Sequence, residues 1–240
     1  MDGVDWLLGL SLVAIAGVTR GFSGFGSAMI LAPGLSLIFN PQQVVATVIL
    51  LEMSASVGLT SEALPNTKWQ EVLPMAIAAI LTIPIGVYFL LLLDPLLMRR
   101  IIGGLILAFV VLLSLSKHSH IKTSISLSSI VGAMSGFLTG LTGMGGPPIV
   151  LYELSGEGTA AKNRANWISF FALTQFVALL IYFVQGLLSV WVLQHFLLFL
   201  PMFLVGLISG KFLFKWVDEK LFRNLVLGLL LIVAVFALWV

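Results

Sequence analysis

The sequence carries too few charges for a water-soluble protein of its size. Only 9% of its 240 residues are Asp, Glu, Lys or Arg, whereas 60% are hydrophobic, and a soluble domain carries about 25% charged residues. A surface this poor in charge cannot face water, so most of the chain must face lipid. Several apolar runs reach the roughly 17–25 residues that a membrane-spanning helix needs. The long runs cover residues 44–58, 72–93, 101–115, 167–188, 192–210 and 225–240.

Composition also limits the chemistry. There is no cysteine, and none of the three histidines is paired with another histidine or a carboxylate at metal-ligand spacing, so no metal or other cofactor is expected. The net charge of +2 includes no long basic cluster, which excludes nucleic acid as a partner. No alternation with a period of two recurs at about ten residues, so an outer-membrane barrel is not expected. The sequence therefore predicts an all-α integral membrane protein.

The chain contains an internal duplication. A Gly-x3-Gly-x2-Gly-x-Gly pattern recurs 119 residues later, and a second matched set recurs 124 residues later. The first set pairs Gly17, Gly21, Gly24 and Gly26 with Gly136, Gly140, Gly143 and Gly145, and the second pairs Gly86, Asp94, Arg99 and Gly104 with Gly210, Asp218, Arg223 and Gly228. Such repeats are common in secondary transporters. We predict two homologous transmembrane halves, residues 1–116 and 128–240, joined by a polar linker at 117–127.

Each half opens with two short apolar runs around a glycine-rich segment, followed by three long helices. In the first half the short runs cover residues 6–19 and 27–39, and runs of about 10–14 residues suit re-entrant segments. The pair forms either a re-entrant hairpin, which gives inverted repeats, or a broken helix that crosses the membrane, which gives parallel repeats. Lysine and arginine placement satisfies the positive-inside tendency in both arrangements. We favour inverted repeats, with both termini on the periplasmic side of the inner membrane.

Glycine-rich motifs interrupt the helices at residues 19–27 and 139–148. Glycine lets the backbone leave the helix and expose N–H groups, and Pro147 suits the first turn of a resumed helix. A helix N-terminus inside the membrane offers N–H donors and the positive end of a dipole, which favour an anion. The alternative is that these glycines only permit close helix packing, which Gly17, Gly21, Gly136 and Gly140 also fit.

Four stretches of the sequence carry a resemblance to a known family. They read TRGFSGFGSAMILAP, GLTGMGGPPIVLYEL, LLLDPLLMRRIIGG and KNRANWISFF, and together they resemble the sulfite exporter TauE/SafE family of membrane transporters. The resemblance covers nearly the whole chain. It implies a multi-helix inner-membrane carrier for anions such as sulfite, sulfonates or related organosulfur acids, and it does not name the anion.

Arg20 and Glu52 are the charges furthest from any polar loop, and charges inside a membrane are costly and usually functional. Arg20 adjoins the first glycine motif, so we expect it to hold the anion; the alternative is a structural pair with Glu52. Glu52 is a candidate for proton coupling, because a carboxyl group removed from water binds a proton more readily. Its alternative is a neutral packing residue. Glu153 and Asp94 lie at segment ends and are expected to face water.

We therefore predict a substrate site where the two glycine motifs converge near the middle of the membrane. Polar lining from the second half is expected of Asn166, Thr174 and Gln175. The predicted substrate-binding residues are Arg20, Gly21, Ser23, Gly24, Gly26, Ser27, Thr142, Gly143, Gly145, Gly146, Pro147, Asn166 and Gln175.

These features predict a secondary transporter that exports a small anion through a multi-pass protein in the lipid bilayer. A passive anion channel that uses the same glycine site is an alternative. An intramembrane enzyme is not expected, because neither HExxH nor GxSxG occurs in the sequence. The sequence leaves the oligomeric state open, and a homo-oligomer is compatible with it.

Overall fold

The computed structural model describes residues 3–115, 124–154 and 159–213, and all regular structure in these residues is helical. Seven of the helices are long and apolar enough to cross a membrane, so the prediction of an all-α membrane protein is confirmed. The apolar run at 225–240 lies outside the described residues. The helices are α1 (Gly3–Ser23), α2 (Ser27–Ser36), α3 (Pro41–Ala63), η1 (Leu64–Asn66), α4 (Trp69–Leu92), α5 (Pro95–Leu115), α6 (Ile125–Thr142), α7 (Gly146–Leu154), α8 (Ala160–Val184) and α9 (Val190–Leu213).

Polar residues at the predicted loops begin several of these helices. The side chain of Asn40 accepts a hydrogen bond from the backbone N–H of Gln42 at the start of α3, where Pro41 occupies the first turn. The side chains of Ser124 and Thr159 accept from backbone N–H groups in the first turns of α6 and α8. Each cap satisfies a donor that has no partner within the helix. The short loops therefore fix where the long helices begin.

The first helix is longer than the sequence predicts. We expected the run to end at residue 19, but α1 continues through Arg20 and Gly21 to Ser23. Gly21 remains helical because it packs where a Cβ atom would collide with the backbone of Leu207 in α9. In the other half, α6 likewise continues through Gly140 to Thr142. Each break in the helix therefore starts after the second glycine of the repeated pattern.

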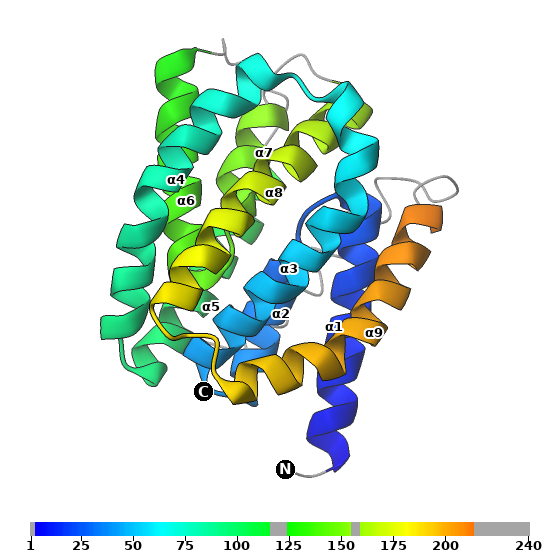
Figure 1. Cartoon of the computed structure of the whole chain (residues 1–240), viewed down its shortest axis with the longest axis vertical. Coiled ribbons are helices and arrows are strands. Elements are labelled where there is room, and N and C mark those ends of the chain that lie inside the picture. The colour runs from blue at the N-terminus through cyan, green and yellow to red at the C-terminus, as the bar shows by residue number, and fades with distance from the viewer. Residues whose placement is uncertain (1–2, 116–123, 155–158, 214–240) are drawn as a thin grey trace.

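Two pairs of helices touch through their backbones, and each pair joins one half of the chain to the other. Gly17 of α1 lies against Gly206 of α9, and Gly140 of α6 lies against Gly86 of α4. Residue numbers rise together along both pairs, so the paired helices are parallel, and Figure 1 shows them side by side. These contacts agree with the alternative interpretation, in which the glycines permit close helix packing. The glycines concerned are Gly17, Gly21, Gly136 and Gly140.

The helices α3 and α8 meet between these two pairs and run in opposite directions. Ser56 of α3 contacts Gln175 of α8, while Thr67, just past the end of α3, contacts Ser169. The short helices α2 and α7 follow α1 and α6, and α2 turns back toward the end of the molecule where the chain begins (Figure 1). Residues from α1, α2, α3, α7 and α8 therefore meet in the interior of the bundle.

Candidate functional site

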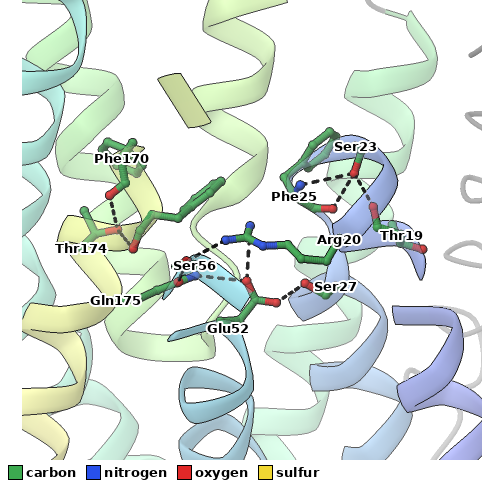
Figure 2. Close-up of polar contacts among 11 residues, drawn as sticks. Thr19, Arg20, Ser23, Phe25, Ser27, Glu52, Ser56, Phe170, Thr174 and Gln175 are labelled. Atoms are coloured by element: carbon green, nitrogen blue, oxygen red, sulfur yellow. Dashed lines mark hydrogen bonds and ion pairs between the residues drawn. The ribbon is translucent and has the colours of Figure 1, made fainter. Parts of the chain in front are cut away.

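The interior contains a closed ring of four polar side chains. Arg20 Nη1 lies 3.4 Å from Glu52 Oε2, and Arg20 Nη2 donates a hydrogen bond of 3.0 Å to Ser56 Oγ. Ser56 Oγ donates to Gln175 Oε1 at 2.7 Å, and Gln175 Nε2 closes the ring by donating to Glu52 Oε2 at 3.1 Å. Figure 2 shows these side chains reaching toward one another from α1, α3 and α8. All four are at most 3% exposed.

The carboxylate of Glu52 has three donors. Besides Arg20 and Gln175, Ser27 donates its hydroxyl hydrogen to Glu52 Oε1. Ser27 is the first residue of α2, so the carboxylate also faces the N-terminal end of that helix, where the positive end of the helix dipole lies. The ring thus holds Arg20 and Glu52 as a buried pair.

The guanidinium of Arg20 retains hydrogen-bonding capacity. It has five N–H donors, and the ring uses one at each terminal nitrogen, while the buried Nε has no hydrogen-bond partner. Its Cζ lies 5.0 Å from the centre of the Phe171 ring, a geometry in which the aromatic face attracts the cation. Arg20 is therefore charge-paired on one side and stacked on another, with donors left for a further acceptor.

The first break joins α1 to α2 over three residues. Gly24 adopts φ +81° and Gly26 φ +92°, which residues with a Cβ atom rarely adopt. Gly24 N donates to Arg20 O, and Ser23 Oγ bonds within the break, donating to Thr19 O and accepting from Phe25 N. The Ser23 hydroxyl, which we expected to bind the anion, thus stabilises the break.

The second break joins α6 to α7 with the same hydrogen bonds. Gly143 adopts φ +73° and its N–H donates to Thr139 O, while Met144 N donates to Thr142 Oγ1. Thr142 Oγ1 in turn donates to Leu138 O, so its hydroxyl also stays within the break. Gly145 fits closely beside Thr139, and its carbonyl accepts from Ser135 Oγ. Pro147 lies, buried, in the first turn of α7.

The two breaks approach each other around aromatic rings. A Cβ atom on Gly146 would lie 3.6 Å from the Phe171 ring and 3.8 Å from the Phe25 ring. Phe25 also packs edge-on against Trp167, with ring centroids 5.1 Å apart. Phe171 thus stands between the start of α7 and the guanidinium of Arg20. The glycine motifs converge as the sequence predicts, although an aromatic residue separates the second from the charged ring.

Positions 119 residues apart correspond at this site, and they differ in chemistry. Ser56 and Gln175 correspond and bond to each other. Ser27 contacts Glu52, and the corresponding Gly146 contacts Phe171. The position that corresponds to Arg20 is Thr139. The first half therefore contributes the charges, and the second half contributes backbone, an amide and an aromatic face.

The predicted residues fall into three groups. Arg20, Ser27, Glu52 and Gln175 lie together in or against the polar ring. The glycines at the breaks shape the backbone, and Gly143 packs on Val48 of α3 while Gly21 packs on α9. Asn166 lies elsewhere, nine residues before Gln175 on α8, where it contacts Glu71 and Glu153.

Three residues at the site escaped the sequence analysis. Ser56 lies one helical turn after Glu52, and Phe171 lies one turn before Gln175, so helical spacing places each on the same face as a predicted residue. Arg164 donates to Gly21 O at 3.0 Å and packs its Cγ against Gly24. The spacing of four residues from a predicted residue could have identified Ser56 and Phe171. Nothing in the local sequence distinguishes Arg164 from a cation in a loop.

A second polar cluster lies at the end of α7. Asn166 Nδ2 lies 3.2 Å from Glu71 Oε2 and 3.3 and 3.1 Å from the two carboxylate oxygens of Glu153. Lys68 and Lys162 each bond Glu71 Oε1. Glu153, expected to face water, is 93% buried because α8 and the start of α4 close over it, so that expectation is wrong.

Comparison with known proteins yields one match. The family described as Sulfite exporter TauE/SafE matches residues 9–237 of the chain, which spans every helix discussed above except the first turns of α1. No curated protein and no solved structure matches the chain.

Proposed function

The chain belongs to the TauE/SafE family of sulfite exporters, and from that premise we propose that it exports a small anion, sulfite or a related organosulfur acid, as a secondary transporter of the inner membrane. The family is one of membrane transporters for anions, which favours transport over intramembrane catalysis. The observation that carries the finer proposal is the buried ring around Arg20, which places a guanidinium with spare donors between the two helix breaks.

In the proposed cycle, Arg20 exchanges its partner. A guanidinium can hold an oxyanion through two parallel hydrogen bonds, and an arginine without a counter-charge would be expensive at this depth. Glu52 supplies the counter-charge in the empty state, as the 3.4 Å pair indicates. When the anion binds, the guanidinium turns toward it, and Ser27 and Gln175 remain to hydrogen-bond the carboxylate that it leaves.

Proton coupling follows from the same exchange. Once Arg20 has turned away, Glu52 stays buried without a cation, and a buried carboxylate that loses its counter-charge binds a proton. One anion would thus enter together with one proton, so the loaded site carries the same charge as the empty one. Anion flux is thereby linked to proton flux: an inward pH gradient drives the anion inward, and net export requires an outward anion gradient that exceeds it.

The aromatic side of the site bears on the substrate class. Phe25, Trp167 and Phe171 form an apolar wall next to Arg20 and the start of α7. An organosulfonate has a charged oxygen face and an apolar substituent, so its two ends match the guanidinium and this wall. Inorganic sulfite matches only the guanidinium and the backbone donors.

The opposite directions of α3 and α8 support inverted repeats, a construction in which one half rocks against the other around a fixed site. We place both termini on the periplasmic side, so that the α3–α4 connection and the start of α8 face the cytoplasm. That end carries Lys68, Lys162 and Lys211, as the positive-inside tendency requires.

Flux measurements in proteoliposomes test the carrier against the channel. Purified protein is reconstituted, and labelled sulfite uptake is followed with an inward pH gradient and no sulfite gradient. A proton-coupled carrier accumulates sulfite above the external concentration, and a protonophore collapses that accumulation. Uptake that stops at equal concentrations on both sides, with the pH gradient intact, would identify a passive channel and reject the proposal.

A binding screen identifies the anion. Thermal stability of the detergent-solubilised protein is measured with sulfite, thiosulfate, small alkyl- and arylsulfonates, and carboxylates of matched size. Ligands that bind the folded state raise the unfolding temperature, and the rise grows with the ratio of ligand concentration to Kd. Stabilisation by sulfonates beyond sulfite would support the role of the aromatic wall, and stabilisation by carboxylates alone would contradict an organosulfur substrate.

A further inference from the structure

The polar cluster at the end of α7 takes no part in the proposed anion exchange. It contains Glu153 from α7, Asn166 and Lys162 from α8, and Glu71 and Lys68 from the start of α4. Within the described residues, the Glu153 carboxylate bonds to Asn166, whereas both lysines bond to Glu71. The buried carboxyl group of Glu153 thus lies near the carboxylate of Glu71, and both lysines bind Glu71.

The geometry around Asn166 leaves one contact unsatisfied. Its amide nitrogen lies within 3.3 Å of three carboxylate oxygens, but an amide group has only two hydrogens to donate. Its oxygen is already engaged by the backbone N–H of Lys68. One amide therefore supplies at most one hydrogen to each carboxylate, and Glu71 has both lysines besides, whereas Glu153 shares this amide alone among the described contacts. A proton on one of them would remove the excess acceptor and the repulsion between the like charges.

Glu153 is the carboxyl group on which that proton would reside. Burial and, to a smaller extent, the charge of Glu71 raise the pKa of Glu153 against the opposing effects of Asn166, Lys162 and Lys68, to a net value of about 7. On its own helix the adjacent group is Tyr152, which faces Ser128 and Ser124 at the start of α6. Glu71, in contrast, holds its two lysines at 3.2 and 3.3 Å and so remains ionised.

The helix α7 connects this cluster to the second break. It is nine residues long; Gly146 at its start lies against Phe171 and Phe25, and Glu153 lies in its last turn. A short helix moves as one body, so a change in the contacts of Glu153 displaces the start of α7. The corresponding position in the first half is Gly34, packed on Leu12, so only the second half carries this carboxyl group.

We propose that Glu153 is a second proton-binding site, separate from Glu52, and that the proton it binds holds α7, and with it the second helix break, in the arrangement seen here. Loss of that proton creates repulsion with Glu71 and loosens the end of α7. Proton binding itself does not depend on the transport function, whereas the effect on transport rests on it. The two claims therefore have separate tests.

Infrared titration of the whole protein tests proton binding without any transport. The parent protein should show a protonated carboxyl band that disappears on raising the pH, with a midpoint of about 7. Glu153→Gln should lack that band. Glu71→Gln should keep it with a lower midpoint, because it removes the negative neighbour and frees Lys68 and Lys162. Absence of any such band in the parent protein would overturn the proposal, even where a variant fails to fold.

Transport of sulfite into proteoliposomes tests the coupling to the break. The transport rate of the parent protein should change with pH, with the same midpoint as the infrared band. The pH is varied on the side of the membrane at which the end of α7 lies. Glu153→Gln should lose the change in rate at that midpoint and keep only the pH dependence that Glu52 gives. The control is Glu62→Gln, which removes an exposed carboxylate paired with Lys211 and should keep the parent profile. An unchanged profile in Glu153→Gln would reject the coupling and leave the proton site as a local feature.

Discussion

The two helix breaks have the same backbone but opposite surroundings. In both, a glycine with positive φ donates its N–H to the carbonyl four residues back, and the hydroxyl of the residue before that glycine accepts from the N–H of the residue after it. The first break holds an arginine, a glutamate and a serine in contact, whereas Thr139, Phe171 and Gly146 occupy the corresponding positions of the second. A duplicated scaffold therefore specifies where a ligand can lie, and later divergence specifies which half supplies the charge.

The largest loss of transport is expected from substitution of the glycines with positive φ, on which both breaks depend. Gly24→Leu and Gly143→Leu should each abolish anion transport, because a side chain at positive φ costs about 1–2 kcal/mol and blocks the approach to the break. The first should be the more severe, since a Cβ atom there lies 3.0 Å from Arg164 Cγ, against 3.4 Å from Val48 at Gly143.

Initial rates in proteoliposomes, with membrane insertion and folding checked separately, provide the measurement for these glycine variants. Gly104→Leu is the matched control, because an added Cβ atom there meets nothing within 4 Å. Near-normal transport by both break variants would leave helix packing as the sole role of these glycines.

Arg20 should produce the next largest effect and separates charge from geometry. Arg20→Ala removes two charge-assisted hydrogen bonds, worth about 3 kcal/mol together, and should weaken anion binding about 100-fold. Arg20→Lys keeps the charge but loses the paired donors, so its loss should be smaller. Equilibrium binding of the identified anion to purified, folded variants decides the matter. If Arg20→Ala binds as tightly as the parent, the arginine is structural and the breaks alone hold the anion.

Glu52 should affect coupling more than binding. Glu52→Gln preserves the shape: its amide oxygen can accept from Arg20 and its NH2 group can donate to the Ser27 hydroxyl, but it cannot bind a proton in exchange. The variant should still catalyse anion exchange and should lose its response to a pH gradient. Counterflow and pH-driven uptake are measured on the same vesicles. A pH-driven uptake equal to the parent's would eliminate Glu52 as the proton carrier.

The smallest effect is expected at the position that corresponds to Arg20 in the second half. Thr139→Val keeps the side-chain shape beside Gly145 and removes the hydrogen bond from Oγ1 to Ser135 O. It should cost about 1 kcal/mol of stability and leave the anion affinity unchanged. Thermal unfolding and anion binding of the variant provide the two readouts. A large loss of affinity would show that the second break contributes side-chain chemistry and that the halves are more alike than their residues indicate.

The sequence was sufficient for the class of fold and for half of the site. Apolar length predicts the membrane helices, and the duplicated glycines predict two breaks that converge. Arg20 and Glu52 can be identified because they are the charged residues furthest from any polar loop, and the two do pair. The position of Asn166 could not be predicted, because it depends on which ends of α4, α7 and α8 meet. Nor could the burial of Glu153, since a residue at a helix end faces water unless another helix covers it.

The contact of α1 with α9 has a consequence for how the protein is made. Gly17 and Gly21 need the backbone of α9, whose glycine at 206 is synthesised roughly 190 residues later. At about 5–20 residues per second of synthesis, α1 waits about 10–40 s in the membrane for its partner. The matching contact between α4 and α6 forms far sooner, because only α5 and the connections on either side of it separate them. The half that emerges first therefore completes its packing last, and the Arg20 site is assembled only when nearly the whole chain has left the ribosome.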